Sequence, residues 1–438
     1  MPDSSSRRVV ITGMGVVCPL GNSTAEMWDA LSSGRSGVAP LVNLPAIEGK
    51  FTYGGEARDF TGHIDNFGEL PKDRKKAIRK ALKMMCRETM MAVAAAQQAI
   101  NEAGFAEEAM EPERSGVVFG SDYMLSPPDD FLNGLNKCGA DQADFRFDQW
   151  GQTGLPEMNP LWMLKFLPNM PASHIGILND LRGPNNSLTM REVSGLLAIR
   201  EAAQTIARGH ADRIVAGACG TRIHSFKSIH ADQTEQLADA SLPPEKASRP
   251  FDKDRTGMVL GEGAGALLLE EREAAIARGA TIYGEILGTG SAAGDMLAEQ
   301  SSNDKSLATA GNAALQEAQL KPDQLGHISA HGLGTVEADA QEAQAIAAVG
   351  GETASEVPTV AAKSYFGNLG AASCVVELIA SVMALREGKL FATLNHESPG
   401  STSPVNIAAA GSSAGDSFLK LSVTPQGQAA AVVVGQQG

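Results

Sequence analysis

The sequence predicts an α/β protein of two similar halves, on the basis of its composition and of two matching stretches. The chain has 438 residues, of which 43% are hydrophobic, so it can bury large cores and is expected to form more than one compact unit. Its 47 glycines and its low share of aromatic residues, 5%, suit helices that pack tightly on a sheet. The run RVVITGMG, from Arg8 to Gly15, is typical of a buried strand that feeds a tight turn, and YGEILGTGSAAG near Thr281 repeats this pattern. We therefore expect one half over residues 1–275 and a second over residues 276–438.

Charge and cysteine usage exclude several classes of protein. The net charge of -15 argues against a general nucleic-acid or anionic-membrane binder. The five cysteines form no CxxC pair and have no metal-like spacing, so we expect reduced, mostly buried thiols and no metal or organic cofactor. The opening MPDSSSRR lacks the apolar run of a signal peptide, and no stretch approaches transmembrane length, which predicts a cytoplasmic protein without a membrane span.

Four stretches of the first half are interpreted in chain order. Apolar spacing predicts a helix from Ser23 to Gly34, and SGVVFGS, from Ser115 to Ser121, is another strand-and-glycine unit. Leu125 to Gly154 is polar and has little periodicity, which predicts a long excursion over the surface or at a dimer interface. Leu161 to Leu178 is apolar and contains prolines, and this composition is compatible with ordinary core.

The stretch from Gly183 to Asp212 predicts a strand, a sharp turn and a helix. Residues up to Met190 are typical of a strand end, Arg191-Glu192 of a turn, and Val193 to Arg208 of a helix closed by Gly209. Glu192 is thus expected at a helix N-terminus, on a strand-turn-helix corner. Several enzyme classes display a nucleophile at such a corner, because the turn exposes the side chain and the helix end stabilises negative charge.

This stretch resembles the active-site segment of the beta-ketoacyl-acyl carrier protein synthases, condensing enzymes of the thiolase superfamily. In that family the turn reads Thr-Ala-Cys and the cysteine carries the growing acyl chain, whereas here the same register reads Met190-Arg191-Glu192. RPFDKDRTGMVLGEGAGALLLEE, from Arg249 to Glu271, is the strongest signature of the family and carries fold identity. The resemblance spans Arg8 to about Val434 and implies a duplicated, five-layered αβαβα thiolase-like fold.

Two further segments resemble the family's catalytic motifs. ISAHGLGTVEAD matches the family's His-Gly-Thr-Gly-Thr, which implies that His331 occupies the position of the histidine that stabilises the enolate, with Thr335 beside it at the substrate. Lys363 and Glu377 fall where the family keeps a lysine and a glutamate that order the site. The family's second histidine is replaced by Asn368, whose amide donates a hydrogen bond but cannot exchange a proton near pH 7.

One more segment departs from the family's pattern, and one cysteine must be compared with the family's nucleophile. The family's Gly-Phe-Gly-Gly gate is absent from Ser417 to Val434, although a last strand from Ala430 to Val434 is predicted. Cys219 follows the short predicted strand from Arg213 to Gly217 but precedes no helix start, so we interpret it as structural.

The basic stretch LPKDRKKAIRKALKMMCRE, from Leu70 to Glu88, is a candidate docking surface. Its cations recur at helical spacing and make much of one face positive, which is either a solvated face or a docking surface. Because the resemblance implies an acidic acyl carrier protein as partner, we expect Lys76, Arg79 and Lys83 to contact it.

Two functions remain open from the sequence. The favoured one is a non-condensing subunit that resembles the chain-length or chain-initiation factors of type II fatty-acid and polyketide systems, as a homodimer or paired with an active ketosynthase. A ketosynthase needs a low-pKa thiolate, whereas Glu192 would be held ionised by the helix end, or would pair with Arg191 or His331 and seal the cavity. The alternative is an enzyme that acts on acyl- or malonyl-carrier thioesters by decarboxylation or general-base chemistry with Glu192 and His331. In either case we expect condensation by this ketosynthase (acyltransferase) fold to be lost.

Overall fold

The computed structural model describes residues 7–44, 51–105, 110–294, 303–353, 356–399 and 405–436. The opening MPDSSS, on which part of the expectation about signal peptides rests, lies outside these residues. No helix within the described part is both long and apolar enough to cross a bilayer.

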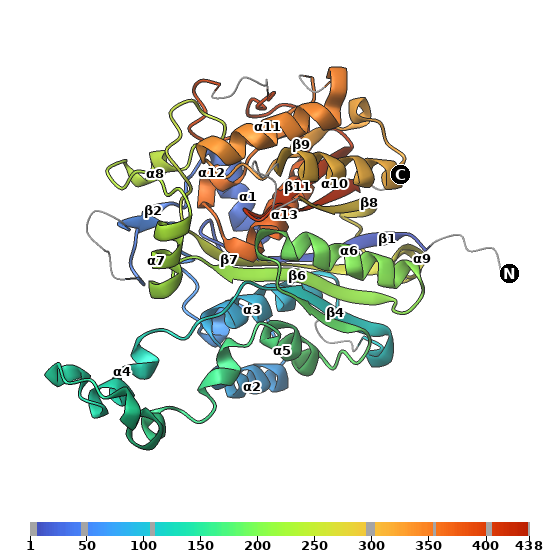
Figure 1. Cartoon of the computed structure of the whole chain (residues 1–438). Helices are drawn as coiled ribbons and strands as arrows, with labels where there is room; N and C mark the ends of the chain where they lie inside the picture. The colour runs from blue at the N-terminus through green and yellow to red at the C-terminus, as the bar shows by residue number, and fades with distance from the viewer. Residues whose placement is uncertain are drawn as a thin grey trace.

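Ten strands of the described chain join into one mixed sheet, and two short strands pair separately (Figure 1). The strands of the large sheet are β1 (Val9–Val17), β4 (Ser115–Gly120), β5 (Asn185–Leu188), β6 (Arg213–Thr221), β7 (Glu262–Glu271), β8 (Gly284–Ala293), β9 (His327–Ser329), β10 (Thr359–Val360), β11 (Ser417–Val423) and β12 (Gln428–Gly435). The separate pair is β2 (Ala39–Pro40) with β3 (Tyr53–Gly54).

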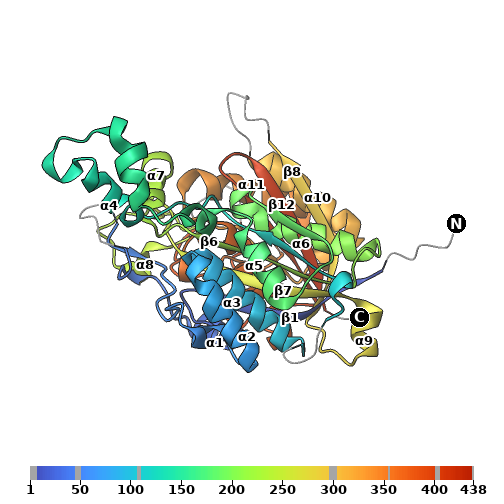
Figure 2. The same cartoon turned by 90° about the horizontal axis from the view of Figure 1, so that it is seen from below.

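The helices lie in three layers around this sheet (Figures 1 and 2). Their bounds are α1 (Thr24–Ser33), α2 (Lys72–Ala81), α3 (Arg87–Glu102), α4 (Asp129–Lys137), α5 (Met170–Asn179), α6 (Ser194–Ala207), α7 (Ser225–Thr234), α8 (Pro244–Ala247), α9 (Arg272–Ala277), α10 (Asn303–Ala318), α11 (Val336–Gly350), α12 (Lys363–Phe366) and α13 (Ser373–Glu387). Helices α3 and α5 cover one outer face, α10 and α11 cover the other, and α6 and α13 lie between the two halves of the sheet.

The strand order shows that the fold is duplicated. The first half runs β5-β4-β6-β7-β1 and the second runs β10-β9-β11-β12-β8, so corresponding strands follow one another in the same order. In each half the first three strands are parallel and the last two are antiparallel to their neighbours. The halves meet where β1 pairs with β8 through Val10–Glu285 and Ile11–Gly284. The predicted two-half α/β architecture is confirmed, whereas the division after residue 275 falls inside α9 and stays a prediction.

A pair of glycines in each half lets a helix approach the sheet closely. On β1 and β8 these glycines face the backbone of α3 and α10, and a Cβ atom at any of them would collide with a carbonyl oxygen. The distances from such a Cβ to the oxygen are 2.0 Å for Gly13–Ala99, 2.0 Å for Gly15–Ala95, 2.2 Å for Gly288–Ala314 and 1.9 Å for Gly290–Ala310. The repeated Gly-x-Gly of the sequence therefore marks the same helix-on-strand contact in both halves.

Most elements of the first half lie where the sequence predicts them. Ser23 caps α1 by accepting a hydrogen bond from the Glu26 amide, and Gly34 ends it in the left-handed conformation, with φ of 72°. The stretch from Leu125 to Gly154 forms α4 and several short helical turns, which extend from the body as an arm (Figures 1 and 2). The apolar stretch that follows forms a 3-10 helix, Trp162–Phe166, and then α5.

The basic stretch departs from its predicted continuous helical face. Helix α2 ends at Ala81, a 3-10 turn follows over Leu82–Met84, and Arg87 starts α3. The Arg87 guanidinium turns inward, with Nε 2.9 Å from a carboxylate oxygen of the buried Glu262. Because a buried carboxylate requires a cationic partner, Arg87 is withdrawn from the surface that the other cations share.

The close helix-on-strand contact predicts a large effect of one methyl group. We expect Gly13→Ala to lower the free energy of unfolding by about 1–3 kcal/mol, because the helix or the strand must shift to admit the Cβ atom. Gly151→Ala is the matched control, since nothing lies within 4 Å of its Cβ position, and it should change stability by less than about 1 kcal/mol. Urea denaturation of both variants measures this, and equal midpoints would show that the contact is not tight.

Candidate functional site

The predicted corner is confirmed between β5 and α6. A 3-10 turn, Arg191–Val193, links the strand to the helix, and Arg191 adopts a positive φ of 51°. The Ser194 hydroxyl accepts a hydrogen bond from the Met190 amide at 2.8 Å and donates one to the Arg191 carbonyl at 2.8 Å. The turn is thus fixed from both sides, and it directs Glu192 into the protein, where it is 1% exposed.

Two guanidinium groups and one amide surround the Glu192 carboxylate. Arg222 Nη2 donates to Oε1, and Asn368 Nδ2 donates to the same oxygen at 3.3 Å. Arg191 Nε lies 3.3 Å from Oε2. Burial by itself would raise the pKa of Glu192, but the charges of Arg222 and Arg191 outweigh burial and hold this pKa well below its usual range. The carboxylate is therefore ionised.

Glu235 closes these contacts into a ring. Its Oε1 accepts a hydrogen bond from Arg222 Nη1 at 3.1 Å and another from Arg191 Nη2 at 2.8 Å. Glu192, Arg222, Glu235 and Arg191 thus alternate in charge, and we call these four residues the charge ring. Burial alone would lower the pKa of Arg222, but the surrounding carboxylates raise it, so its guanidinium stays charged at 1% exposure.

His331 follows β9 and is held in place by its backbone. Its amide and that of Gly332 donate to Glu342, at 2.6 and 2.7 Å. Lys363 Nζ donates to the His331 carbonyl at 2.7 Å and lies 3.3 Å from Nδ1. Burial, followed by the positive charges of Lys363 and Lys420, holds the pKa of His331 well below its usual value, so the imidazole is neutral.

Glu377 joins two buried lysines behind His331. Its Oε1 lies 2.6 Å from Lys363 Nζ, and its Oε2 lies 2.5 Å from Lys420 Nζ. All three side chains are at most 1% exposed. Lys420 lies on β11, which pairs with β9 on one side and β12 on the other, so residues 418–422 form a paired strand. The predicted last strand is confirmed as β12.

Asn368 is oriented by its own hydrogen bonds. Its Oδ1 accepts from the Gly370 amide at 3.0 Å and from the Ser373 hydroxyl at 3.1 Å, which leaves the NH2 group pointing at Glu192. Its NH2 group thus donates to a carboxylate of the chain itself, and also to Met258 Sδ at 3.5 Å.

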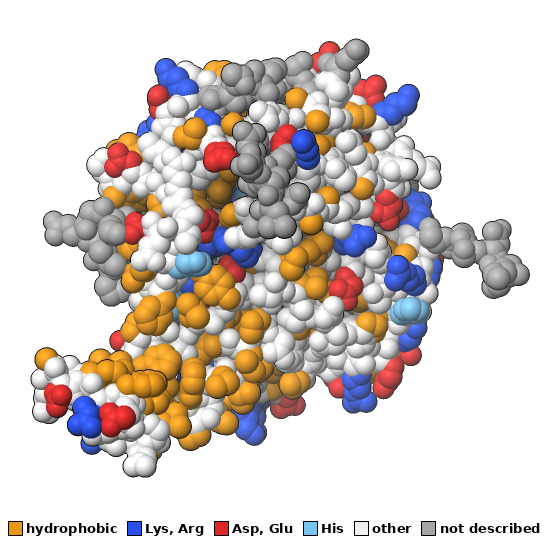
Figure 3. Space-filling view, in the orientation of Figure 1, with side chains coloured by type: hydrophobic (Ala, Val, Ile, Leu, Met, Phe, Trp, Pro, Cys, Tyr) orange, Lys and Arg blue, Asp and Glu red, His pale blue; other side chains and the backbone are white. Residues whose placement is uncertain are grey.

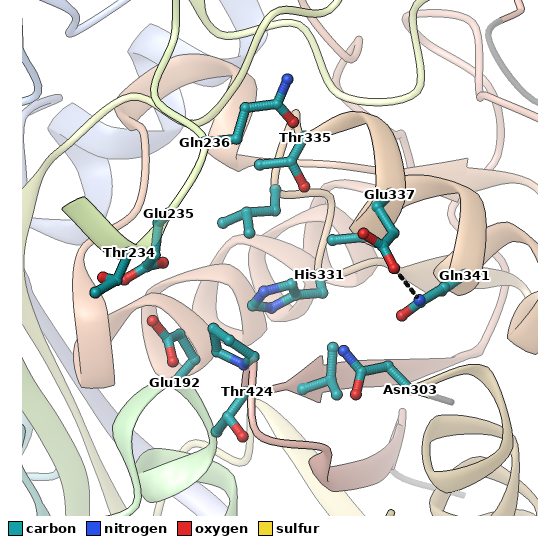
Figure 4. A pocket seen from close by; sticks show the side chains of 14 residues that line it. Glu192, Thr234, Glu235, Gln236, Asn303, His331, Thr335, Glu337, Gln341 and Thr424 are labelled. Atoms are coloured by element: carbon teal, nitrogen blue, oxygen red, sulfur yellow. Dashed lines mark hydrogen bonds between the residues drawn. The ribbon is translucent and has the colours of Figure 1, made fainter. Parts of the chain in front are cut away.

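Some of the groups described above border a cavity of about 230 Å³ (Figure 4). Glu192 and His331 approach it from the corner and from β9, whereas Glu337 and Gln341 reach it from α11. Thr335, predicted to lie at the substrate, also lines it. The remaining lining residues are Thr234, Glu235, Gln236, Asn303, Leu333, Ala338, Val423, Thr424 and Pro425. Ten of the fourteen lining residues carry polar or charged side chains, and none is a cysteine.

Two family models match the chain over most of its length. The model "Beta-ketoacyl synthase, N-terminal domain" matches residues 6–275, and "Beta-ketoacyl synthase, C-terminal domain" matches residues 283–397. The chain belongs to the beta-ketoacyl synthase family.

Relatives and solved structures agree with this membership. The chain is 33% identical over 402 residues to the 3-oxoacyl-[acyl-carrier-protein] synthase 2 of Synechocystis sp., covering 91% of this chain and 90% of the relative. It is 32% identical to the nodulation protein E of Rhizobium leguminosarum bv. trifolii, covering 90% of each chain. A structure of the ishigamide ketosynthase/chain length factor matches with a TM-score of 0.83 and 26% identity over 99% of this chain and 100% of that one. A beta-ketoacyl synthase from Burkholderia phymatum STM815 matches with a TM-score of 0.81, 26% identity and the same coverage. The predicted thiolase-like fold is confirmed.

The structure of this beta-ketoacyl synthase family member brings some of the predicted residues together and separates others. Glu192 and His331 border one cavity, while Lys363 and Asn368 lie directly behind them. The predicted carrier contacts Lys76, Arg79 and Lys83 are exposed on and after α2, and none of them lines this cavity. Within the described residues, no cluster of histidine, cysteine or carboxylate side chains could hold a metal ion.

Most partners of Glu192 were not predicted from the sequence. Arg222 directly follows β6, which ends beside β4 near the corner, and Glu235 follows α7. A charged residue straight after a buried strand was the available signal for Arg222. Lys420 lies within the stretch that lacks the family's gate, and a lysine within a buried strand requires a buried carboxylate.

Glu342 predicts a pH dependence of stability. Burial raises its pKa to about 7, against about 4.3 in an unfolded chain, so between these values the folded state holds a proton that the unfolded state has lost. Its contribution to stability is therefore complete below about pH 4.3 and is lost as the pH rises through 7. Between pH 5 and pH 8 the wild-type protein should lose roughly 2–3 kcal/mol more than Glu342→Gln does. Urea denaturation across this range tests it, and parallel pH profiles would contradict it.

Proposed function

We propose that this protein is a non-condensing ketosynthase-like subunit of type II fatty-acid or polyketide assembly, which pairs with an active ketosynthase in the manner of a chain length factor. The observation that carries the proposal is Glu192, ionised within the charge ring at the corner where the resemblance puts the nucleophilic cysteine. Each consequence of this replacement disables condensation but leaves the fold able to bind a partner.

Condensation requires a thiolate at the cavity, and the cysteines of this chain do not supply one. All five are buried, and none lines the cavity. Burial raises the pKa of Cys18 and Cys86 to about 12 and that of Cys374 to about 11. Attack by Glu192 on a thioester would give a reactive anhydride rather than a stable acyl-enzyme. Its Oε1 already accepts from Arg222 and Asn368, and its Oε2 forms an ion pair with Arg191.

The anchored strand β11, in the stretch without the family's gate, also supports a role without turnover. A condensing enzyme exchanges the carrier arm repeatedly, which needs backbone that moves. Here Lys420 anchors β11 through Glu377, and the Ser422 hydroxyl donates to the Glu192 carbonyl at 2.9 Å. The gate segment is thus tied both to the buried lysine cluster and to the corner.

An exposed apolar surface supports the pairing with a second subunit. Hydrophobic side chains gather over the arm and the adjoining body of the protein in Figure 3, and Phe147 and Ile177 are 74% and 77% exposed. Leu132, Phe145, Leu155, Leu161 and Met163 are also exposed in the arm and the stretch that follows it, as are Phe226 and Ile229 on α7. Exposed apolar side chains of this number mark a protein interface. In addition, β5 is an edge strand of the large sheet and can pair with a second chain.

The similar proteins support this choice of partner. One of the matching structures is a ketosynthase/chain length factor, and the Synechocystis relative is named for an acyl-carrier protein. By the same reasoning we propose that the chain works with an acyl carrier protein and within a dimer.

A second candidate is decarboxylation of a malonyl-carrier thioester or general-base chemistry. The position of His331 at the cavity, with Lys363 and Glu377 behind it, favours it, because a neutral imidazole donates to an enolate oxygen. The ionised Glu192 argues against it, since the carboxylate repels that of malonate and its lowered pKa makes it a weak base.

A mass-spectrometric assay separates the two candidates. We expect the purified protein, incubated with malonyl- and acyl-carrier protein, to show no carbon dioxide loss, hydrolysis or acyl transfer beyond that of Glu192→Ala. An active ketosynthase expressed with it should co-purify. Turnover by the wild-type protein that disappears in Glu192→Ala would instead establish an enzyme with Glu192 in its mechanism.

The basic surface of α2 predicts the carrier's docking position. Reversing Lys76, Arg79 and Lys83 to glutamate should weaken binding of an acyl carrier protein by at least about tenfold at low salt, because three attractions become repulsions. The control reverses Lys246, Lys253 and Lys389, which are equally exposed but lie elsewhere, and should change affinity much less. Equal losses in the two triple variants, measured by calorimetry, would rule out a specific docking surface on α2.

A further inference from the structure

Arg222 is a buried cation directly beneath the corner. Its backbone is fixed, because its amide donates to the Gly261 carbonyl at 2.8 Å and its carbonyl accepts from the Ser228 hydroxyl at 3.1 Å. Its side chain extends from the end of β6 to Glu192, with Nε 3.7 Å from Asp122 after the end of β4. The side chain thus spans the gap between two strand ends and the start of α6.

The guanidinium occupies the space on the inner side of Glu192. Glu192 lines the cavity, but Arg222 does not, so the cation lies behind the carboxylate as seen from the cavity. The turn at Gly370 closes the remaining side, since a Cβ there would lie 3.5 Å from Arg222 Nε and 3.2 Å from Asp122 Oδ2. Within the described residues, the room beside residue 192 is the cavity of about 230 Å³.

We infer that Arg222 is a plug that excludes acyl chains from the interior of this subunit at the corner. An extended alkyl chain that entered there would have to displace a guanidinium from three carboxylates and leave charges unpaired in a dry environment, which is strongly unfavourable. The inference rests on the proposed non-condensing function and deepens it, because the carboxylate at the corner is accompanied by a buried cation packed against it.

The inference predicts that a thiol at the corner restores acylation by short groups only. In Glu192→Cys, the introduced thiolate would attack the carbonyl of an acyl-coenzyme A, forming a new C–S bond while the old C–S bond breaks and the coenzyme A thiolate leaves and is protonated by water. Iodoacetamide and acetyl-coenzyme A should modify this variant from the cavity, whereas octanoyl-coenzyme A should not. In Glu192→Cys/Arg222→Ala, the octanoyl adduct seen by intact-protein mass spectrometry should rise at least about tenfold relative to the acetyl adduct.

A matched control distinguishes space from charge. Glu192→Cys/Arg191→Ala removes the other guanidinium of the charge ring, which contacts Glu235 from a side chain that is 19% exposed. It should accept acetyl but not octanoyl groups. Equal octanoyl yields in the two double variants, or an octanoyl adduct of Glu192→Cys as abundant as its acetyl adduct, would overturn the inference.

A folding failure of the double variants leaves the inference testable. Glu192→Cys alone can be acylated with donors of two to eight carbons, and its adduct should fall steeply with chain length. A yield independent of length would show that Arg222 blocks nothing. Failure of the proposed function would appear elsewhere, as turnover by the wild-type protein with carrier-bound substrates.

Discussion

Helices α3 and α10 lie so close to β1 and β8 that these strands have no room for side chains where they touch. The glycine pairs at residues 13 and 15 and at residues 288 and 290 meet alanine carbonyls spaced four residues apart on the facing helix, in both halves alike. This contact sets the outer layers tightly on the sheet and leaves α6 and α13 as a shared middle layer, with α13 buried along nearly its whole length. The corner at the start of α6 therefore opens into the dry centre of the protein, and any charge there must find a partner.

The charges at this centre form two groups on either side of His331. On one side the charge ring neutralises Glu192, and on the other Glu377 lies between Lys363 and Lys420. Removing one member of such a group leaves an uncompensated buried charge, which costs far more than a surface ion pair contributes. Both groups therefore hold their side chains in fixed positions. The His331 imidazole between them is kept neutral by burial and by the positive charges of the lysines.

The sequence predicted the local elements well because their signals are local. The cap at Ser23, the glycine stop of α1 and the strand-turn-helix around Glu192 each depend on residues within one or two turns of each other. The partners of Glu192 could not be found this way, because Arg222 and Asn368 lie 30 and 176 residues further along the chain. The inward turn of Arg87 was missed for the same reason: its carboxylate, on Glu262, lies 175 residues away, and the helical periodicity of the basic stretch gave no sign of it.

The proposed departures from the family pattern have one physical feature in common, which is that they reduce reactivity and movement at the site. Under the proposed function, a nucleophile, a proton carrier and a flexible gate have given way to an ion-paired carboxylate, an amide whose donor faces that carboxylate, and a strand anchored by a buried lysine. Each replacement exchanges a group that must react or move for one held by its neighbours. A catalyst needs room for its substrate at the corner. A subunit that only shapes and holds an active partner benefits instead from a corner that is filled by its own side chains. For the proposed role these charges are an advantage, since they fix the strand ends from which the arm and α7 extend to the apolar surface.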